Sequence, residues 1–142
     1  MTFATFLIVI IVFLSWGVGG FIAKMATNKI GAQSLFWDMI VYAPIIILSS
    51  LIMFKFENIL QVARENKIGA GLAILAGVVG SFGFIGYYLL LSREEASTIV
   101  PLTALYPALT AALAIIFLHE SLTFTKLLGI ILSLIAIYFL SK

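Results

Sequence analysis

The sequence contains no cysteine and only one histidine. Without thiols, disulfide bonds and thiolate metal sites are excluded, and a single imidazole is too few ligands to hold zinc by itself. We therefore expect no metal site and no cofactor. A nucleophile beside a base, an acidic pair at working spacing and a phosphate-binding loop are also missing, so the chain is not expected to be an enzyme.

Charged residues are scarce as well. They make up 10% of the 142 residues, whereas 63% are apolar and the mean hydropathy is +1.24. A soluble domain is about half apolar and about a quarter charged, so this chain has too little polar surface to cover a water-facing globule. The net charge of +2 is spread through the turns without a basic run, which gives no indication of nucleic-acid binding. The lipid bilayer is the expected surrounding of most side chains.

Long apolar runs make up most of the sequence. A helix needs roughly 20 apolar residues to cross the hydrocarbon core, and continuous rather than alternating apolar runs favour helices over a β-barrel. The first run lacks a basic start and a cleavage site, so we interpret it as a retained helix and not as a signal peptide. We predict an all-α integral membrane fold, a single domain over residues 1–142, with five transmembrane helices at about 3–22, 35–54, 69–91, 96–118 and 124–140.

Between the second and third spans, apolar residues recur at helical spacing among polar ones. They are Phe56, Ile59, Leu60 and Ala63. This pattern predicts a short helix lying at the membrane interface.

The third span carries glycines at Gly77, Gly80, Gly83 and Gly86. Glycine lets helix backbones approach closely in a membrane, which explains such a surface without any ligand. The same missing side chains would also allow helices to rock and would leave room for a substrate. Both interpretations remain open from the sequence.

The fourth span contains Pro101 and Pro107, neither of which can donate a backbone hydrogen bond. Hydroxyls at Thr98, Thr103 and Thr110 lie close enough in sequence to satisfy the carbonyls that the prolines release. We expect a kinked helix. It is either an ordinary proline-containing span or an irregular segment lining a cavity.

In the first span, Trp16 begins a flexible stretch that runs through Gly17 toward Lys24. Its ring is expected either to anchor the helix at the membrane interface or to face the bundle and contact a small substrate. Asp38 and Glu120 lie near span ends, where each is either a solvated charge or, for Glu120, a contact between the fourth and fifth helices. No acid lies at a helix centre, so the usual intramembrane carboxylate for proton or sodium coupling is missing.

The basic residues are balanced across the membrane. With five spans, the amino-terminal side receives Lys55, Arg64, Lys67 and Lys126, and the other side receives Lys24, Lys29, Arg93 and Lys142. An excess of Lys and Arg on one side sets the orientation of a membrane protein. This chain has no such excess, so its sequence does not favour one orientation strongly. Either a few dominant loops or an external factor set its topology, or it inserts both ways and the two forms pair as an antiparallel dimer.

The last two spans resemble a known family. Pro-Leu-Thr-Ala-Leu-Tyr-Pro at 101–107, Ile-Phe-Leu-His-Glu-Ser-Leu-Thr at 116–123 and Gly129 are similar to the EamA-like domain of the drug/metabolite transporter superfamily, as are Trp16-Gly17 and Lys24-Met25-Ala26. The resemblance covers essentially the whole chain, and its five-span length matches one repeat unit. Longer members carry two inverted units and move amino acids, sugars or organic cations.

By this resemblance Pro107 corresponds to the family's kink-forming proline and Glu120 to its glutamate after the fourth span. Asp38 departs from the pattern, because many members carry a basic residue early in the second span. The small multidrug-resistance relatives have an essential acid in the first span, and this chain has none between Met1 and Ile22.

The sequence as a whole predicts a multi-pass transporter of small metabolites or organic cations in the cell (inner) membrane, working by alternating access as a dimer of half-size units. The partner chain is a second copy, antiparallel or not, or a similar half-size chain in a heterodimer. A non-transporting accessory membrane subunit or a lipid-linked flippase is the alternative. The predicted substrate cavity is lined by Trp16, Gly17, Tyr87, Thr103, Tyr106 and Pro107, and the predicted gating or structural charges are Lys24, Asp38 and Glu120.

Overall fold

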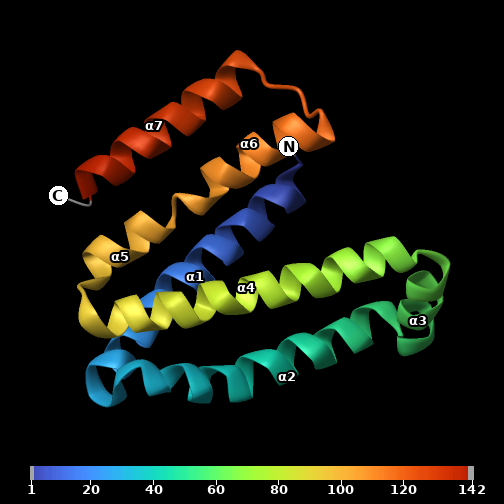
Figure 1. Cartoon of the computed structure of the whole chain (residues 1–142), viewed down its shortest axis with the longest axis horizontal. Helices are drawn as coiled ribbons and strands as arrows, with labels where there is room; N and C mark the ends of the chain where they lie inside the picture. The colour runs from blue at the N-terminus through green and yellow to red at the C-terminus, as the bar shows by residue number, and fades with distance from the viewer. Residues whose placement is uncertain (1, 141–142) are drawn as a thin grey trace. The chain divides into compact units, whose positions relative to one another are not determined.

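The computed structural model describes residues 2–140, and over that range the chain is helical, without strands. The elements are α1 (Phe3–Ile30), the 3-10 helix η1 (Gly31–Gln33), α2 (Ser34–Phe54), α3 (Phe56–Glu65), α4 (Lys67–Arg93), α5 (Ala96–Thr103), α6 (Tyr106–Leu118) and α7 (Phe124–Leu140), as Figure 1 shows. The all-α prediction is confirmed. Lys142, one of the cations in the predicted charge balance, lies outside the described residues.

Three helical stretches of the described chain are long and apolar enough to cross a membrane. They are Phe3–Phe54, Lys67–Arg93 and Ala96–Leu118, and the first of them contains both α1 and α2. A shorter apolar helix follows at Phe124–Phe139. Because the 17 residues of α7 extend only about 25 Å, Lys126 near its start must reach toward the headgroups if α7 spans the bilayer.

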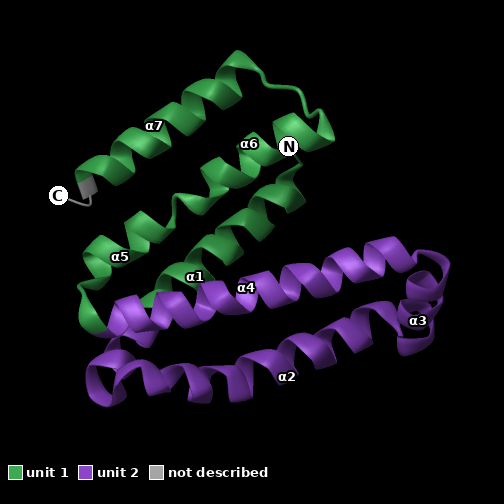
Figure 2. Ribbon diagram, viewed as in Figure 1, with its two compact units in different colours: residues 1–21, 93–142 green, residues 22–92 purple. Residues whose placement is uncertain are grey.

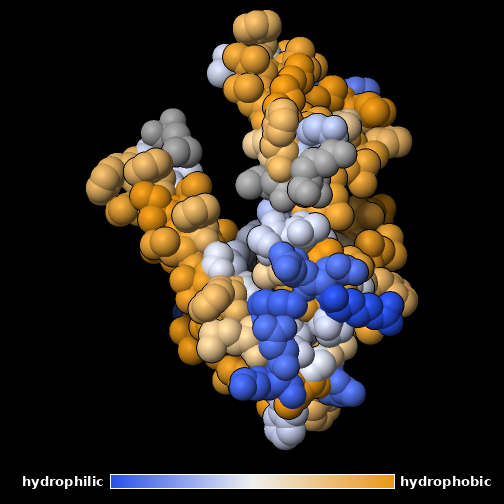
Figure 3. All heavy atoms as spheres, turned by 90° about the vertical axis from the view of Figure 1, so that its left-hand side faces the viewer, coloured by the Kyte–Doolittle hydropathy of each residue, from blue (hydrophilic) through white to orange (hydrophobic). Residues whose placement is uncertain are grey.

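Most of the described surface is apolar. Figure 3 shows hydrophilic residues gathered in one region of a largely hydrophobic face. The only apolar side chains that are buried among the described residues are Tyr88, Leu91 and Ile99. Such a surface is stable only where lipid or other helices replace water.

The chain divides into two compact units, coloured separately in Figure 2. Unit 2 comprises residues 22–92, with the end of α1, then η1, α2, α3 and α4 up to Ser92. Gly31 has φ +66 in the turn from α1 to α2, where a Cβ would lie 2.8 Å from Gln33 Oε1. Glycine adopts this left-handed backbone without penalty, and the Ser34 hydroxyl braces the turn by donating to the Gly31 carbonyl oxygen at 2.9 Å.

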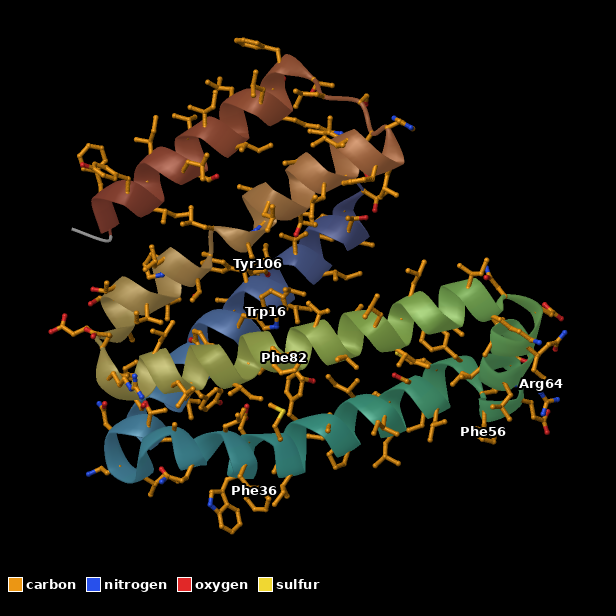
Figure 4. All side chains as sticks on the ribbon, in the orientation of Figure 1. Trp16, Phe36, Phe56, Arg64, Phe82 and Tyr106 are labelled. Carbon is orange, nitrogen blue, oxygen red and sulfur yellow. The ribbon has the colours of Figure 1, made fainter. Side chains whose placement is uncertain are left out.

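The predicted short helix between the second and third spans is present as α3. It begins after Lys55, whose positive φ of 55 turns the chain out of α2. At its other end the Asn66 side chain caps α4, because its Oδ1 accepts the Gly69 amide at 2.8 Å. The polar residue Arg64 and the apolar residue Phe56 both lie on this helix (Figure 4).

Unit 1 comprises residues 1–21 and 93–142, with the first part of α1 and the helices α5, α6 and α7. Within it α5 packs against α7. His119 ends α6 in the left-handed conformation, with φ 54 and ψ 34, and reverses the chain toward α7.

Two expectations about the first span need correction. Helix α1 continues to Ile30, beyond the predicted end of the first span at about residue 22, so Lys24 lies within the helix. The glycines after Trp16 do not interrupt α1, because a single helix includes Gly17, Gly19 and Gly20. Backbone N–H and C=O groups, those of the glycines included, pair with one another along the helix, because lipid offers them no other partner.

Candidate functional site

The fourth predicted span consists of two helices separated by a break. Helix α5 ends at Thr103 and α6 begins at Tyr106, so Ala104 and Leu105 lie between them. Pro107 has no N–H for the Thr103 carbonyl, and its ring crowds that carbonyl in a continuous helix. As the second residue of α6, the proline occupies a position where a missing amide costs little. The irregularity predicted from the prolines is therefore present as a break.

The threonine hydroxyls near this break bond to carbonyls one turn back along the chain. Thr103 Oγ1 donates to the Ile99 carbonyl oxygen at 2.8 Å and to that of Val100 at 3.1 Å, and Thr110 Oγ1 donates to that of Tyr106 at 3.1 Å. None of these acceptors is the Thr103 carbonyl that Pro107 leaves without an amide. The prediction that the hydroxyls would satisfy it is wrong for these two threonines, because each reaches the carbonyl three or four residues before it.

A groove lies between α6 and α7 within unit 1. Its volume is about 390 Å³, and it is lined by Pro107, Ala108, Ala111 and Ile115 from α6, by Glu120, Ser121 and Leu122 from the turn, and by Lys126, Gly129, Ile130 and Ser133 from α7. The structure thus brings Pro107 and Glu120, both predicted as functional residues, to one groove. Charged groups stand at its turn end, and small or apolar side chains follow the helices.

In unit 2, Lys24 bonds to the end of α4. Its Nζ donates to the Leu91 carbonyl oxygen at 2.8 Å, and the buried Thr27 hydroxyl reaches the same oxygen at 3.3 Å. Leu91 lies in the last turn of α4, where carbonyls have no intrahelical amide partner and a cation is favoured by the helix dipole. Lys24 therefore joins α1 to α4.

Asp38 has a partner on the same helix as Leu91. The hydroxyl of Tyr88, a residue only 4% exposed, donates to Asp38 Oδ2 at 2.9 Å. This bond joins α2 to α4, and the ring contact between Tyr42 and Phe84, with centroids 5.9 Å apart, joins the same two helices. Asp38 is therefore a bonded charge in this structure and not simply a solvated one.

The glycine surface of α4 does not pack closely within its own unit. A Cβ built on Gly77, Gly80, Gly83 or Gly86 would meet no atom within 4 Å. Leu91 bonds to α1, and Tyr88 and Phe84 contact α2, so the interactions described above involve other residues of α4. Close packing of this surface remains a prediction.

The six residues of the predicted cavity are divided between the units. Trp16, Gly17, Thr103, Tyr106 and Pro107 belong to unit 1, whereas Tyr87 belongs to unit 2. Trp16 lies on α1 and Tyr106 at the start of α6 (Figure 4), and their side chains are 65% and 57% exposed. Tyr87 packs edge-on against Tyr88, with ring centroids 5.9 Å apart.

A model of the EamA-like transporter family matches residues 3–142. The chain belongs to the EamA-like transporter family. Membership agrees with the apolar helices described above and makes this a multi-pass membrane protein of transporter type.

An uncharacterized protein of Methanocaldococcus jannaschii is 37% identical over 132 residues, which cover 93% of this chain and 92% of the relative. That relative is therefore about as long as one EamA-like unit. No solved structure matches the chain.

Sequence reasoning missed two parts of this arrangement. The groove residues Ala108 and Ala111 on α6, and Gly129 and Ser133 on α7, recur at the spacing of one helix face, so the pattern was readable in the sequence. Tyr88 and Thr27 gave no such signal, because their partners lie 50 and 64 residues away along the chain.

Proposed function

We propose that this member of the EamA-like family is a half-size transporter of small metabolites or organic cations, working as a dimer by alternating access in the cell (inner) membrane. The observation that carries the proposal is the break between α5 and α6. Discontinuous helices in transporters place backbone polar groups beside a substrate, since irregular backbone at membrane depth is tolerated only in contact with protein or a cavity.

The chemistry at the break favours substrate groups that are positively charged or donate hydrogen bonds. Pro107 leaves the Thr103 carbonyl without an amide partner, and the carboxyl end of α5 carries a partial negative charge. The ring of Tyr106, which is largely exposed, offers an aromatic face that attracts cations. Trp16 and Tyr87 are the further aromatic residues that we assign to the cavity.

A dimer supplies the second inverted repeat that a single five-span unit lacks. Many transporters place their substrate between two inverted repeats, and a chain with an odd number of spans can provide both repeats by inserting in both orientations. The balance of four Lys or Arg on each predicted side permits this, and the Methanocaldococcus jannaschii relative is about as long as this chain. We assign Lys24 and Asp38 to holding α1, α2 and α4 together, and Glu120 to the turn that links the last two helices.

The test is transport by the purified protein in liposomes, with a panel of amino acids, sugars, polyamines and quaternary ammonium ions. We expect uptake of at least one solute class and a loss of about fivefold or more in Tyr106→Ala, since a cation on an aromatic face contributes about 1 kcal/mol or more. Phe117→Ala on the same helix, whose ring is 72% exposed, is the matched control and should transport normally. Absence of transport for every solute of the panel would contradict the proposal.

A further inference from the structure

The groove between α6 and α7 has two chemically different parts. Its turn end is lined by the acidic residue Glu120, the basic residue Lys126 and the polar residue Ser121. Its helix walls present small or apolar side chains, including Ala108 and Ala111. A ligand that matches it must therefore be polar at one end and apolar along its length.

The chain does not fill this groove with side chains of its own. Gly129 forms part of the wall, and a Cβ built there would meet no atom within 4 Å. The volume of about 390 Å³ falls within the range of about 300–1,000 Å³ that is usual for small-ligand sites. The volume is large enough for part of an acyl chain.

The two charges at the turn keep bonding capacity for a ligand. Lys126 Nζ donates to the Ser121 carbonyl oxygen at 3.1 Å, and an ammonium has two further hydrogens to donate. Within the described part of the chain, the Glu120 carboxylate takes part in no hydrogen bond or ion pair. A basic and an acidic residue, each with bonding capacity left for a ligand, thus line the same end of the apolar groove.

We propose that the groove binds one phospholipid whose headgroup carries both a phosphate and a primary ammonium. Lys126 binds the phosphate, Glu120 binds the ammonium, and an acyl chain lies along Ala108, Ala111 and Gly129. Charge complementarity favours this lipid over an anionic lipid that has no ammonium group. Such an anionic lipid would place its phosphate near Glu120 and leave that carboxylate without a cation. The site is independent of the proposed transport function, since it needs neither a dimer nor a moving substrate.

The experiment is native mass spectrometry of the purified protein released from micelles that contain equal amounts of phosphatidylethanolamine, phosphatidylglycerol and phosphatidylcholine. We expect one bound phosphatidylethanolamine in preference to the other two lipids. Glu120→Gln should remove the preference over phosphatidylglycerol, and Lys126→Gln should weaken binding of all three lipids by about tenfold, as expected for a charged hydrogen bond.

Gly129→Leu fills the groove and should abolish the phosphatidylethanolamine adduct. Its matched control is Gly71→Leu on α4, where a Cβ also meets no atom within 4 Å and the groove is not affected. Ala111→Leu blocks the opposite wall and repeats the test if Gly129→Leu does not fold, which thermal unfolding of each variant reveals.

Equal retention of the three lipids by the unmodified chain would overturn the proposal, as would an unchanged adduct in the folded groove-filling variants. If those variants instead turned a dimer into a monomer and left lipid binding unaltered, the groove would be a contact between copies, which also overturns it. Transport measured in liposomes is a separate readout, so failure of transport leaves this inference standing.

Discussion

At the residue scale, Lys24 and Asp38 of unit 2 form hydrogen bonds with residues that lie far away in the sequence. Lys24 and Asp38 stand out in the sequence as charges within or beside apolar spans. Their partners are an ordinary backbone carbonyl, that of Leu91, and one tyrosine of an adjacent pair, Tyr88. Lys24 is half-buried and Asp38 is exposed, so burial does not force either charge to pair. The charges were visible in the sequence, whereas their partners depend on which helix faces meet.

We expect Tyr88→Phe to lower the stability of the folded protein by about 1–3 kcal/mol, because the ring is kept and only the hydrogen bond to the Asp38 carboxylate is lost. The measurement is the unfolding midpoint in detergent micelles. Tyr42→Phe on α2 is the matched control, because the contact of Tyr42 with Phe84 is made by its ring and survives the change. Equal stability of Tyr88→Phe and the unmodified chain would show that the hydrogen bond contributes nothing.

At the scale of the element, the position of a proline within its helix decides whether the helix breaks. The chain has three prolines, and two of them, Pro44 and Pro101, lie inside the continuous helices α2 and α5. Only Pro107 coincides with a break, and there it occupies the first turn of the new helix, where its fixed φ is favourable. The presence of Pro101 and Pro107 predicted an irregular fourth span, and the family resemblance pointed to Pro107 as the proline that kinks it; the structure has the break at Pro107.

Replacing Pro107 with alanine supplies an amide for the Thr103 carbonyl, and we expect α5 and α6 to join into one helix. Hydrogen exchange of the protein in micelles should then slow at least about tenfold at Leu105 and Tyr106, because an interior proline costs a helix about 3 kcal/mol. The control is Pro101→Ala, which lies within α5 and should leave exchange at the break unchanged. Unchanged exchange in Pro107→Ala would mean that other contacts maintain the break.

At the scale of the whole molecule, the balance of basic residues concerns how the chain inserts into the membrane. The predicted orientation count places four Lys or Arg on each side, and the family to which the chain belongs uses membrane-spanning helices. Because this count shows no bias, we propose that two opposite orientations have similar free energies. On this proposal, two copies in opposite orientations would form an antiparallel pair without gene fusion.

The absence of cysteine makes the orientation directly measurable, because a single introduced cysteine is the only thiol. In intact cells, a membrane-impermeant maleimide should label about half of the copies of Gln61→Cys on α3, as expected for insertion in both orientations. Gln33→Cys in η1, on the opposite predicted side, should also be labelled in about half of its copies. Complete labelling of one variant and none of the other would establish a single orientation and exclude the antiparallel homodimer.

The sequence by itself determined the membrane class, the helical fold, the short helix at 56–65 and the family, because these follow from composition, apolar run length and local motifs that neighbouring residues contain. Tertiary structure alone decided that Lys24 bonds to Leu91, that Tyr88 holds Asp38, and that Glu120 and Pro107 meet in one groove with Gly129. The difference is physical: lipid imposes helix formation on any long apolar run, whereas the pairing of polar groups depends on which helix faces meet.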